Sequence, residues 1–296
     1  MICQDHASEH ARPAATRRSG AKGAAGRAGL TAAVLLLALP QGGARAADWL
    51  DDTLRGSFTP SPSVRWDGVN LGVQTGLTSM DTDFGSSTGQ QVAYILRNST
   101  LENEASPSSW TALPHNITNS KNYGAFLGYS YQWDQLVLGF DGAYNRMSSA
   151  EAQASDSLTR VVTTSDSVQH TVTISGSSSM KLVDYATARM RAGYAFGQFL
   201  PYAFVGGAVG RFNYTTTSTV TDSQLSGGVT TVFGPVTQTD AKNNAVVGGF
   251  TAGLGLDVAL LPNVFLRGEW EYVGFAQVNG IRSSINTGRV ALGMRF

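Results

Sequence analysis

The sequence predicts an all-β protein: an eight-stranded antiparallel up-and-down transmembrane β-barrel with short periplasmic turns and long extracellular loops. Three observations predict it. Apolar and polar residues alternate in eight segments, the connections between these segments alternate between short and long, and a segment typical of export precedes them. Alternation with a period of two indicates a strand whose two faces meet different surroundings.

Residues 1–46 have the organisation of a secretory signal peptide. Arginines precede an apolar run at 30–39, and Ala44, Ala46 and Ala47 mark the expected cleavage site, where the first two have the A-x-A spacing. The run is too short to span a bilayer, which takes about 20 residues. A buried core helix is the alternative interpretation of the same run.

Cleavage at this site would define the mature chain. It would remove Cys3, the one cysteine of the sequence, and leave no thiol for a disulfide, a metal site or a nucleophile. We expect residues 47–65 to form an N-terminal periplasmic segment and residues 66–296 to form the barrel domain.

The composition narrows the class of protein. Charged residues make up 14% of the chain, below the roughly 25% of soluble domains, and glycine occurs 34 times. The formal net charge is zero, so there is no basic footprint for nucleic acid. Little charge and much glycine fit a transmembrane barrel. They also fit a soluble β-sandwich, so the periodicity has to decide.

The alternating segments have about nine to twelve residues each, the length that a tilted strand needs to cross a bilayer. In the last segment, Val290, Leu292 and Met294 face one side, and Arg289 and Arg295 face the other. In the fifth segment glycines occupy both faces, so its parity stays ambiguous. The segments are 69–77, 123–131, 136–144, 183–194, 202–212, 250–258, 264–273 and 287–296.

The connections support an up-and-down barrel. Short connections at 132–134, 196–199 and 261–263 alternate with long polar ones, as expected for tight periplasmic turns and long outer loops. A Greek-key sandwich has no reason to place every long loop at one end. The long connections are 78–122, 148–181, 213–244 and the shorter 276–284.

Aromatic residues gather at both ends of the predicted strands. Amphipathic rings favour the headgroup region of a membrane, so we expect these residues at its two interfaces. Ordinary aromatic usage in strands is the alternative explanation. Tyr131, Trp133, Phe196, Phe199, Tyr202 and Phe296 mark the short-turn end, and Tyr123, Tyr144, Tyr185, Phe212, Tyr214, Tyr272 and Phe275 mark the long-loop end.

The polar face of the strands is expected to line the barrel interior. A buried charge is costly unless it is paired, and this face carries acids and bases in near balance, so we predict an interior salt-bridge network. Eight strands leave an interior just wide enough for side chains. A wide pore is therefore not expected, and a narrow wet path is left open. The network residues are Asp141, Arg189, Arg191, Asp257, Arg267, Glu269, Glu271, Arg289 and Arg295.

The sequence resembles a family of small outer-membrane β-barrels, the porin-family or opacity-like immunogenic surface antigens of Gram-negative bacteria. The resemblance lies in residues 60–76, 189–208, 250–257 and 261–263, and in the terminal Phe296. It implies an eight-stranded outer-membrane barrel that serves envelope integrity and surface interaction, sometimes with weak channel activity. It also implies that Phe296 is the signal that the outer-membrane assembly machinery recognises.

The expected function is therefore that of a structural outer-membrane barrel and surface antigen that contributes to envelope integrity and surface interactions. The alternative is a narrow, low-conductance porin-like channel for small solutes, and a distant alternative is a soluble periplasmic β-protein. The expected partners are outer-membrane lipid, lipopolysaccharide and the assembly machinery, with no nucleic acid. We expect a monomer.

No catalytic, cofactor or metal site is expected. The mature histidines, His115 and His170, both fall in predicted loops, whereas a membrane-embedded hydrolase would need a histidine beside a serine on adjacent strands. The acidic stretch 81–85 lacks the glycine and glutamate of a helix-loop-helix calcium site, because Ser86 and Val92 stand at those positions.

Overall fold

The computed structural model describes residues 64–111 and 113–296. The predicted signal peptide, its cleavage site at Ala44, Ala46 and Ala47, and residues 47–63 lie outside these described residues. The strands are β1 (Gly68–Asp83), β2 (Asn116–Trp133), β3 (Leu136–Thr163), β4 (Gln169–Tyr194), β5 (Phe199–Ser226), β6 (Val229–Leu261), β7 (Val264–Phe275) and β8 (Arg282–Arg295).

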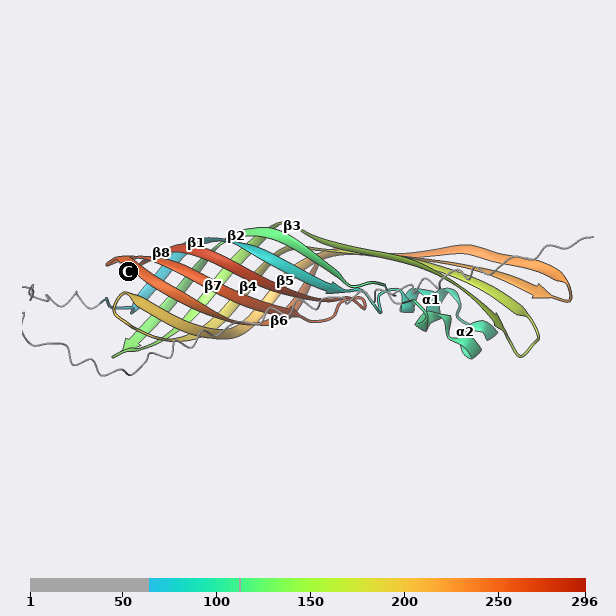
Figure 1. Ribbon diagram of the computed structural model, residues 1–296, viewed down its shortest axis with the longest axis horizontal. Helices are drawn as coiled ribbons and strands as arrows, with labels where there is room; N and C mark the ends of the chain where they lie inside the picture. Colours follow the sequence, from blue (N-terminus) through green and yellow to red (C-terminus); the bar gives the residue numbers. More distant parts are fainter. Residues whose placement is uncertain (1–63, 112) are drawn as a thin grey trace, which may run out of the picture. The chain divides into compact units, whose positions relative to one another are not determined.

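The strands form one closed barrel, in which each strand pairs antiparallel with the next and β8 pairs with β1 (Figure 1). Val73 lies opposite Leu292 in this closing pair. The backbone N–H of Val69 donates to the carbonyl of Phe296 at 3.1 Å, and the N–H of Phe296 donates back at 2.9 Å. The terminal segment therefore closes the barrel, and the predicted fold class is confirmed.

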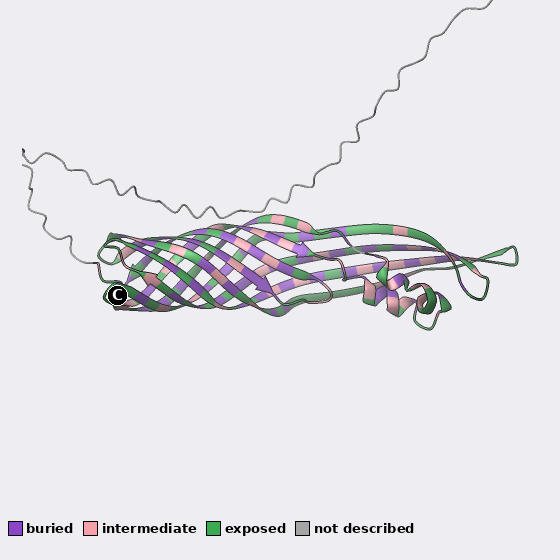
Figure 2. Ribbon diagram, turned by 60° about the horizontal axis from the view of Figure 1, so that its bottom comes forward, coloured by how far each residue is buried: buried purple, intermediate pink, exposed green. Residues whose placement is uncertain are grey.

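The two faces of the strands differ as the sequence predicts. On β1, Val73 is 65% exposed, while its neighbour Gln74 is 4% exposed. Figure 2 shows this alternation along the barrel strands. Apolar side chains outside and polar ones inside are what a barrel in lipid requires. The ambiguous fifth segment is resolved as well, because Val205 points outward while Tyr202 and Phe204 are buried inside.

Two of the predicted long loops, 148–181 and 213–244, are hairpins of paired strands instead. They continue β3, β4, β5 and β6 beyond the barrel, as the yellow-green and orange hairpins of Figure 1 show. These four strands have 28, 26, 28 and 33 residues. The prediction of loops here, and of strands of about nine to twelve residues, is therefore wrong.

The hairpins alternate like the barrel strands, but hydroxyl side chains replace apolar ones on their outward face. Threonine suits this position because its β-branched side chain favours strands. The side-chain oxygens of Thr159 and Thr173 lie 2.9 Å apart across two strands, and so do those of Thr219 and Thr237. A search for apolar alternation misses strands of this kind.

The first long connection, 78–122, is also more ordered than predicted. β1 continues to Asp83 and β2 begins at Asn116. No helix within 64–111 or 113–296 is long and apolar enough to span a membrane. Three short helices lie between the two strands: α1 (Gly89–Ile95), α2 (Thr100–Ala105) and η1 (Pro107–Ser109).

These helices pack against the hairpins and form a small apolar core outside the barrel, which we call the outer core. Val92 of α1 and Leu101 of α2 are buried in one cluster with Val172 and Ile174 of β4 and Val220 of β5. Figure 1 shows α1 and α2 beside these strand extensions. The part of the chain beyond the barrel therefore has a folded core of its own.

Five of the aromatic residues predicted at the membrane interfaces are inside instead. Tyr185 and Phe275 share the inward parity of Arg189 and Glu271, so their place near a strand end does not bring them to lipid. The structure thus corrects the prediction for these positions, because parity decides the face. The five buried residues are Tyr185, Tyr202, Phe212, Tyr214 and Phe275.

Replacing Ile174 by Asp should detach the α1–α2 segment from the hairpins, because the change buries an unpaired charge in the outer core. Proteolysis of intact cells measures this effect. We expect cuts within residues 84–115 to become about tenfold faster or more, while the heat-dependent gel mobility of the barrel stays unchanged.

Thr173→Asp is the matched control, because Thr173 precedes Ile174 on β4 and its side chain points away from the outer core. It should leave the cutting rate near that of the wild type. Equal cutting in the two variants would contradict the packing of the helices on β4.

Candidate functional site

The barrel interior brings eight of the nine predicted charges together. Inward residues recur at every second position, so Arg189 and Arg191 are neighbours on one face of β4, and Glu269 and Glu271 are neighbours on one face of β7. Their side chains are at most 4% exposed. The eight residues, here called the interior network, are Asp141, Arg189, Arg191, Asp257, Arg267, Glu269, Glu271 and Arg289.

Asp257 of β6 binds two arginines. Arg267 donates from Nε and Nη2 to the two carboxylate oxygens, each at 2.8 Å, and Arg191 donates from Nη1 at 3.2 Å. Such a two-pronged contact between guanidinium and carboxylate is both strong and directional. Arg191 also donates to the hydroxyl of Ser130, which ties β4 to β2 across the interior.

Asp141 of β3 is shared by three arginines at slightly longer range. Its Oδ2 lies 3.6 Å from Arg267 Nη1 and 3.7 Å from both Arg189 Nη2 and Arg191 Nε. This carboxylate therefore links the Asp257 pairs to the rest of the network.

Glu269 and Glu271 of β7 form the other half of the network with Arg189 and Arg289. Arg189 Nη1 donates to Glu269 at 3.1 Å and to Glu271 at 3.3 Å. Arg289 Nε lies 2.8 Å from Glu269 Oε2, and its Nη2 lies 2.5 Å from Glu271 Oε2. Each glutamate thus lies near one arginine of β4 and one of β8, and Glu269 Oε1 is also 3.9 Å from Arg267 Nη1.

Buried aromatic rings complete the network, and sequence reasoning missed their role. The hydroxyl of Tyr202 donates to Glu269 at 2.6 Å. The guanidinium of Arg189 lies 4.3 Å from the ring centre of Phe204, and that of Arg267 lies 4.3 Å from the ring centre of Phe126, close enough for cation–π attraction. Phe126 occupies a polar-face position of its segment, so its inward orientation could have been predicted from the sequence. The orientation of Tyr202 and Phe204 could not, because glycines occupy both faces of β5.

Arg295, the ninth predicted member, points inward but lies apart from the network. Its Nη2 donates to the carbonyl of Pro262 at 2.8 Å, and its guanidinium lies 4.8 Å from the ring centre of Trp66. Among the described residues it forms no ion pair. The prediction of one nine-membered network is therefore corrected to eight members and one separate arginine at the short-turn end.

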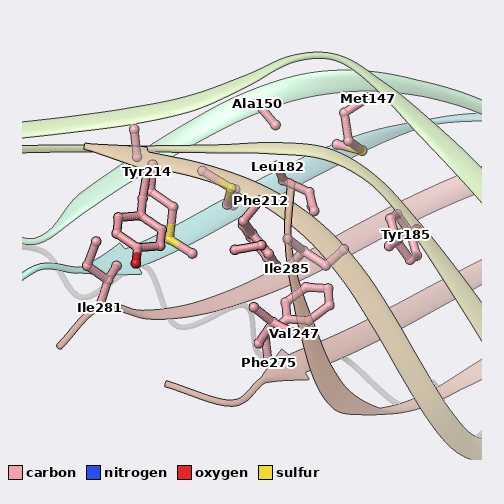
Figure 3. Packing of buried hydrophobic residues seen from close by; sticks show 14 of the residues in the cluster. Met147, Ala150, Leu182, Tyr185, Phe212, Tyr214, Val247, Phe275, Ile281 and Ile285 are labelled. Atoms are coloured by element: carbon pink, nitrogen blue, oxygen red, sulfur yellow. The ribbon is translucent and has the colours of Figure 1, made fainter. Parts of the chain in front are cut away.

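Two apolar clusters accompany the network. The cluster toward the short turns contains Trp66, Leu200 and Phe265. The cluster toward the hairpins contains Phe212 and Ile285, which Figure 3 shows gathered between the strands with other apolar side chains. The four acids and four arginines of the network balance, so the interior is a formally neutral layer with apolar packing on both sides.

His170 corrects another prediction, since it lies on β4 rather than in a loop. Its Nδ1 lies 2.7 Å from Oδ2 of Asp222 on β5, and both side chains are buried. Gln224 donates to the same oxygen at 2.8 Å. His170 Nε2 has no hydrogen-bond partner within 64–111 and 113–296, so no serine hydroxyl there completes a catalytic triad. His115 pairs with Asp81 at the surface.

The turn between β3 and β4 is held by a local hydrogen bond. The hydroxyl of Thr164 donates to the carboxylate of Asp166, and this contact lowers the pKa of Asp166 below its ordinary value. The backbone N–H of Val168 donates to the same carboxylate at 3.3 Å. These contacts fix the turn that precedes His170.

Replacing Arg289 by Leu should lower the free energy of unfolding by about 3–5 kcal/mol, because it removes the nearest arginine from each of the buried Glu269 and Glu271. The temperature at which the folded, fast-migrating form is lost on denaturing gels measures the effect. Arg295→Leu is the matched control on the same strand and the same face, and its loss should be smaller. Equal losses would argue against a special role for the network.

Solved structures similar to this chain include three outer-membrane or surface proteins. Ail from Yersinia pestis, in complex with the heparin analogue sucrose octasulfate, is 12% identical, with 77% of this chain and 99% of Ail covered and a TM-score of 0.31. OprG from Pseudomonas aeruginosa is 10% identical, with 78% and 97% covered and a TM-score of 0.37. Neisserial surface protein A is 13% identical, with 76% and 97% covered and a TM-score of 0.30. These similarities are too low to transfer a function, and no curated protein matches the chain.

A family model gives the assignment. The model described as the outer membrane protein beta-barrel domain matches residues 31–296, which include every strand of the structure. The resemblance seen in the sequence and the outer-membrane location are therefore confirmed, and the alternative of a soluble periplasmic protein is excluded. The chain belongs to the family of outer membrane protein β-barrel domains.

Proposed function

We propose that this protein is a structural outer-membrane barrel, closed to solutes, that displays a folded sheet for surface interactions. The observation that carries the first half of the proposal is the interior network, whose eight side chains are buried and paired. The observation that carries the second half is the pair of long hairpins with their own core.

The packing of the interior favours a scaffold over a channel. An ion that crosses the barrel would have to displace Arg189 or Arg267, each of which is held by several carboxylates and covered by an aromatic ring. Removing a partner from a buried ion pair is costly. The apolar clusters on both sides of the network would add a dehydrated path.

Beyond the barrel, β3 to β6 form a four-stranded sheet with two free edges. Within the described chain, β6 pairs with β5 alone from Val229 to Ala245. β3 pairs with β4 alone from Ala150 to Thr163, although two side chains reach its edge: Asn116 donates to the carbonyl of Gln153 at 2.6 Å, and Thr118 donates to that of Glu151 at 3.1 Å. A free edge exposes backbone donors and acceptors to which an extended peptide can add as a further strand.

The tip of the β5–β6 hairpin is the part of this sheet best suited to contact a partner. Residues 223–239 contain no charged side chain, and only Pro235 among them lacks a backbone N–H. Val229 is 67% exposed and Val232 is 60% exposed. Exposed apolar residues beside an unpaired edge are typical of an interaction surface.

Planar bilayers test whether the barrel is closed. We expect the purified, folded protein to give no discrete conductance steps, because the paired charges fill the interior. A porin reconstituted in the same way should give steps and shows that the assay works. Reproducible steps from this protein would overturn the closed barrel and favour the narrow channel.

Cysteine labelling tests which side the hairpins face, because Cys3 lies in the predicted signal peptide and single cysteines can be introduced into the mature chain. Thr231→Cys, at the exposed β5–β6 tip, should react with a membrane-impermeant maleimide on intact cells. Asn263→Cys, in the exposed β6–β7 turn, should react only after the outer membrane is permeabilised. The opposite pattern would mean that the hairpins face the periplasm.

A further inference from the structure

On three strands, β2, β3 and β5, the outward apolar face ends at a basic residue. On β3 the exposed Phe140 and Tyr144 are followed, at the next outward position, by Arg146. On β5 the outward Val209 is followed by Arg211, whose side chain is 41% exposed. On β2 the exposed Tyr123 is followed, toward the hairpin side, by Lys121. Each basic residue therefore lies just beyond the apolar band of its strand.

The strand register brings these residues together. Arg146 lies opposite Tyr123, which makes Lys121 its diagonal neighbour on β2. Arg146 also lies opposite Asp184 of β4, and Asp184 lies opposite Arg211 of β5. Adjacent strands are about 4.8 Å apart, so this row covers one side of the barrel. Lys181 of β4 lies opposite Asn213, two residues beyond Arg211. The basic patch consists of Lys121, Arg146, Lys181 and Arg211.

One carboxylate organises part of the patch and leaves the rest free. Arg211 donates from Nε to Asp184 Oδ1 at 3.1 Å and also from Nη2 to Oδ2, and Tyr144 donates its hydroxyl to Oδ2 at 3.0 Å. Among the described residues, Lys121, Arg146 and Lys181 form no ion pair. The patch therefore has exposed cationic groups beside a fixed guanidinium.

The local charge balance is positive. Besides Asp184, the nearby acid is Glu151, which lies opposite Lys181 and accepts a hydrogen bond from Gln153 at 2.8 Å. The four cations of the patch thus face two carboxylates. An unpaired cationic side chain at the end of the apolar band is available to an anionic group of the membrane.

The patch occupies one side of the barrel only. On β1 the outward face continues from Leu77 to Ser79 and Asp81, and on β6 it continues from Phe250 through Gly248 to the exposed Val246. These residues are neutral or acidic. On β8 the outward parity carries one basic residue, Arg282, which lies opposite Asp83 of β1. The basic residues at this end of the apolar band are thus concentrated on β2 to β5, as expected for a binding site rather than for a general preference for membrane interfaces.

We infer that the basic patch binds the phosphate groups of lipid A, the phosphorylated glycolipid part of lipopolysaccharide in the outer leaflet. Its residues lie where headgroups meet the apolar band. Lysine attracts phosphate through the point charge of its ammonium group, and arginine binds it through the several N–H donors of its planar guanidinium group. Acyl chains would then lie along the exposed Phe140 and Met190 below the patch. The inference rests on the outward orientation of the hairpins in the proposed function.

Lipid titration of the purified, folded protein in neutral detergent, followed by native mass spectrometry, tests the inference. We expect bis-phosphorylated lipid A to bind about tenfold tighter or more than lipid A stripped of its phosphates. Lys121→Gln combined with Arg146→Gln should remove most of this preference, and Lys181→Gln alone should reduce it. Arg282→Gln, a basic residue of β8 outside the patch, should keep it. Heat-dependent gel mobility confirms that each variant is folded.

Several outcomes would overturn the inference. These are equal binding of the two forms of lipid A, or a preference that survives in the double variant. If phosphatidylglycerol bound as tightly as bis-phosphorylated lipid A, the patch would be a general surface for anionic lipids. If inorganic phosphate at the same concentration displaced lipid A, the ligand would be free phosphate. Labelling of Asn263→Cys instead of Thr231→Cys on intact cells would overturn the outward orientation on which the inference rests. The lipid titration in detergent does not depend on orientation, so the two failures are distinguishable.

Discussion

The pairing of buried charges inside the barrel is the interaction on which the rest of the structure depends. Four arginines and four carboxylates from five strands meet with side chains that are at most 4% exposed. Each charge is tolerated there because it is paired with opposite charges. Most of these partners come from other strands. The network therefore joins β3, β4, β6, β7 and β8 through their side chains, in addition to the backbone ladder. It also fixes the register, since a shift of one residue would turn Arg289 or Glu271 toward lipid.

Strand parity extends this constraint along the whole molecule. The outward positions of β3 and β5 are apolar in the barrel, basic at its outer end, and rich in hydroxyl groups in the hairpins. The inward positions change from charged residues to the apolar clusters and then to the outer core. The same alternation of inward and outward residues thus continues through the barrel, its outer end and the hairpins. In each of these three parts the outward side chains suit the surrounding medium.

The sequence predicted the barrel well because its signal is a contrast between neighbouring residues. Val290 and Arg289 differ so strongly that their faces could be assigned without a structure, and the same is true of Trp270 and Glu271. Where the contrast is weak the prediction failed. Glycines on both faces of β5 concealed Tyr202, and threonine and serine concealed the hairpin strands, because a hydroxyl suits either face. His170 and Arg295 needed three-dimensional information, since their partners Asp222 and Pro262 are distant in the sequence.

The continuity of β3 to β6 has a mechanical consequence. No flexible joint separates the hairpins from the barrel, because the same four strands cross from one to the other and keep their pairing apart from short register shifts. A pull on the β5–β6 tip acts along the strands, so many ladder hydrogen bonds share the force at once instead of opening one after another. The barrel to which the hairpins are joined is stabilised by the interior network. A contact made at the tip is thus attached to the membrane by a stiff connection.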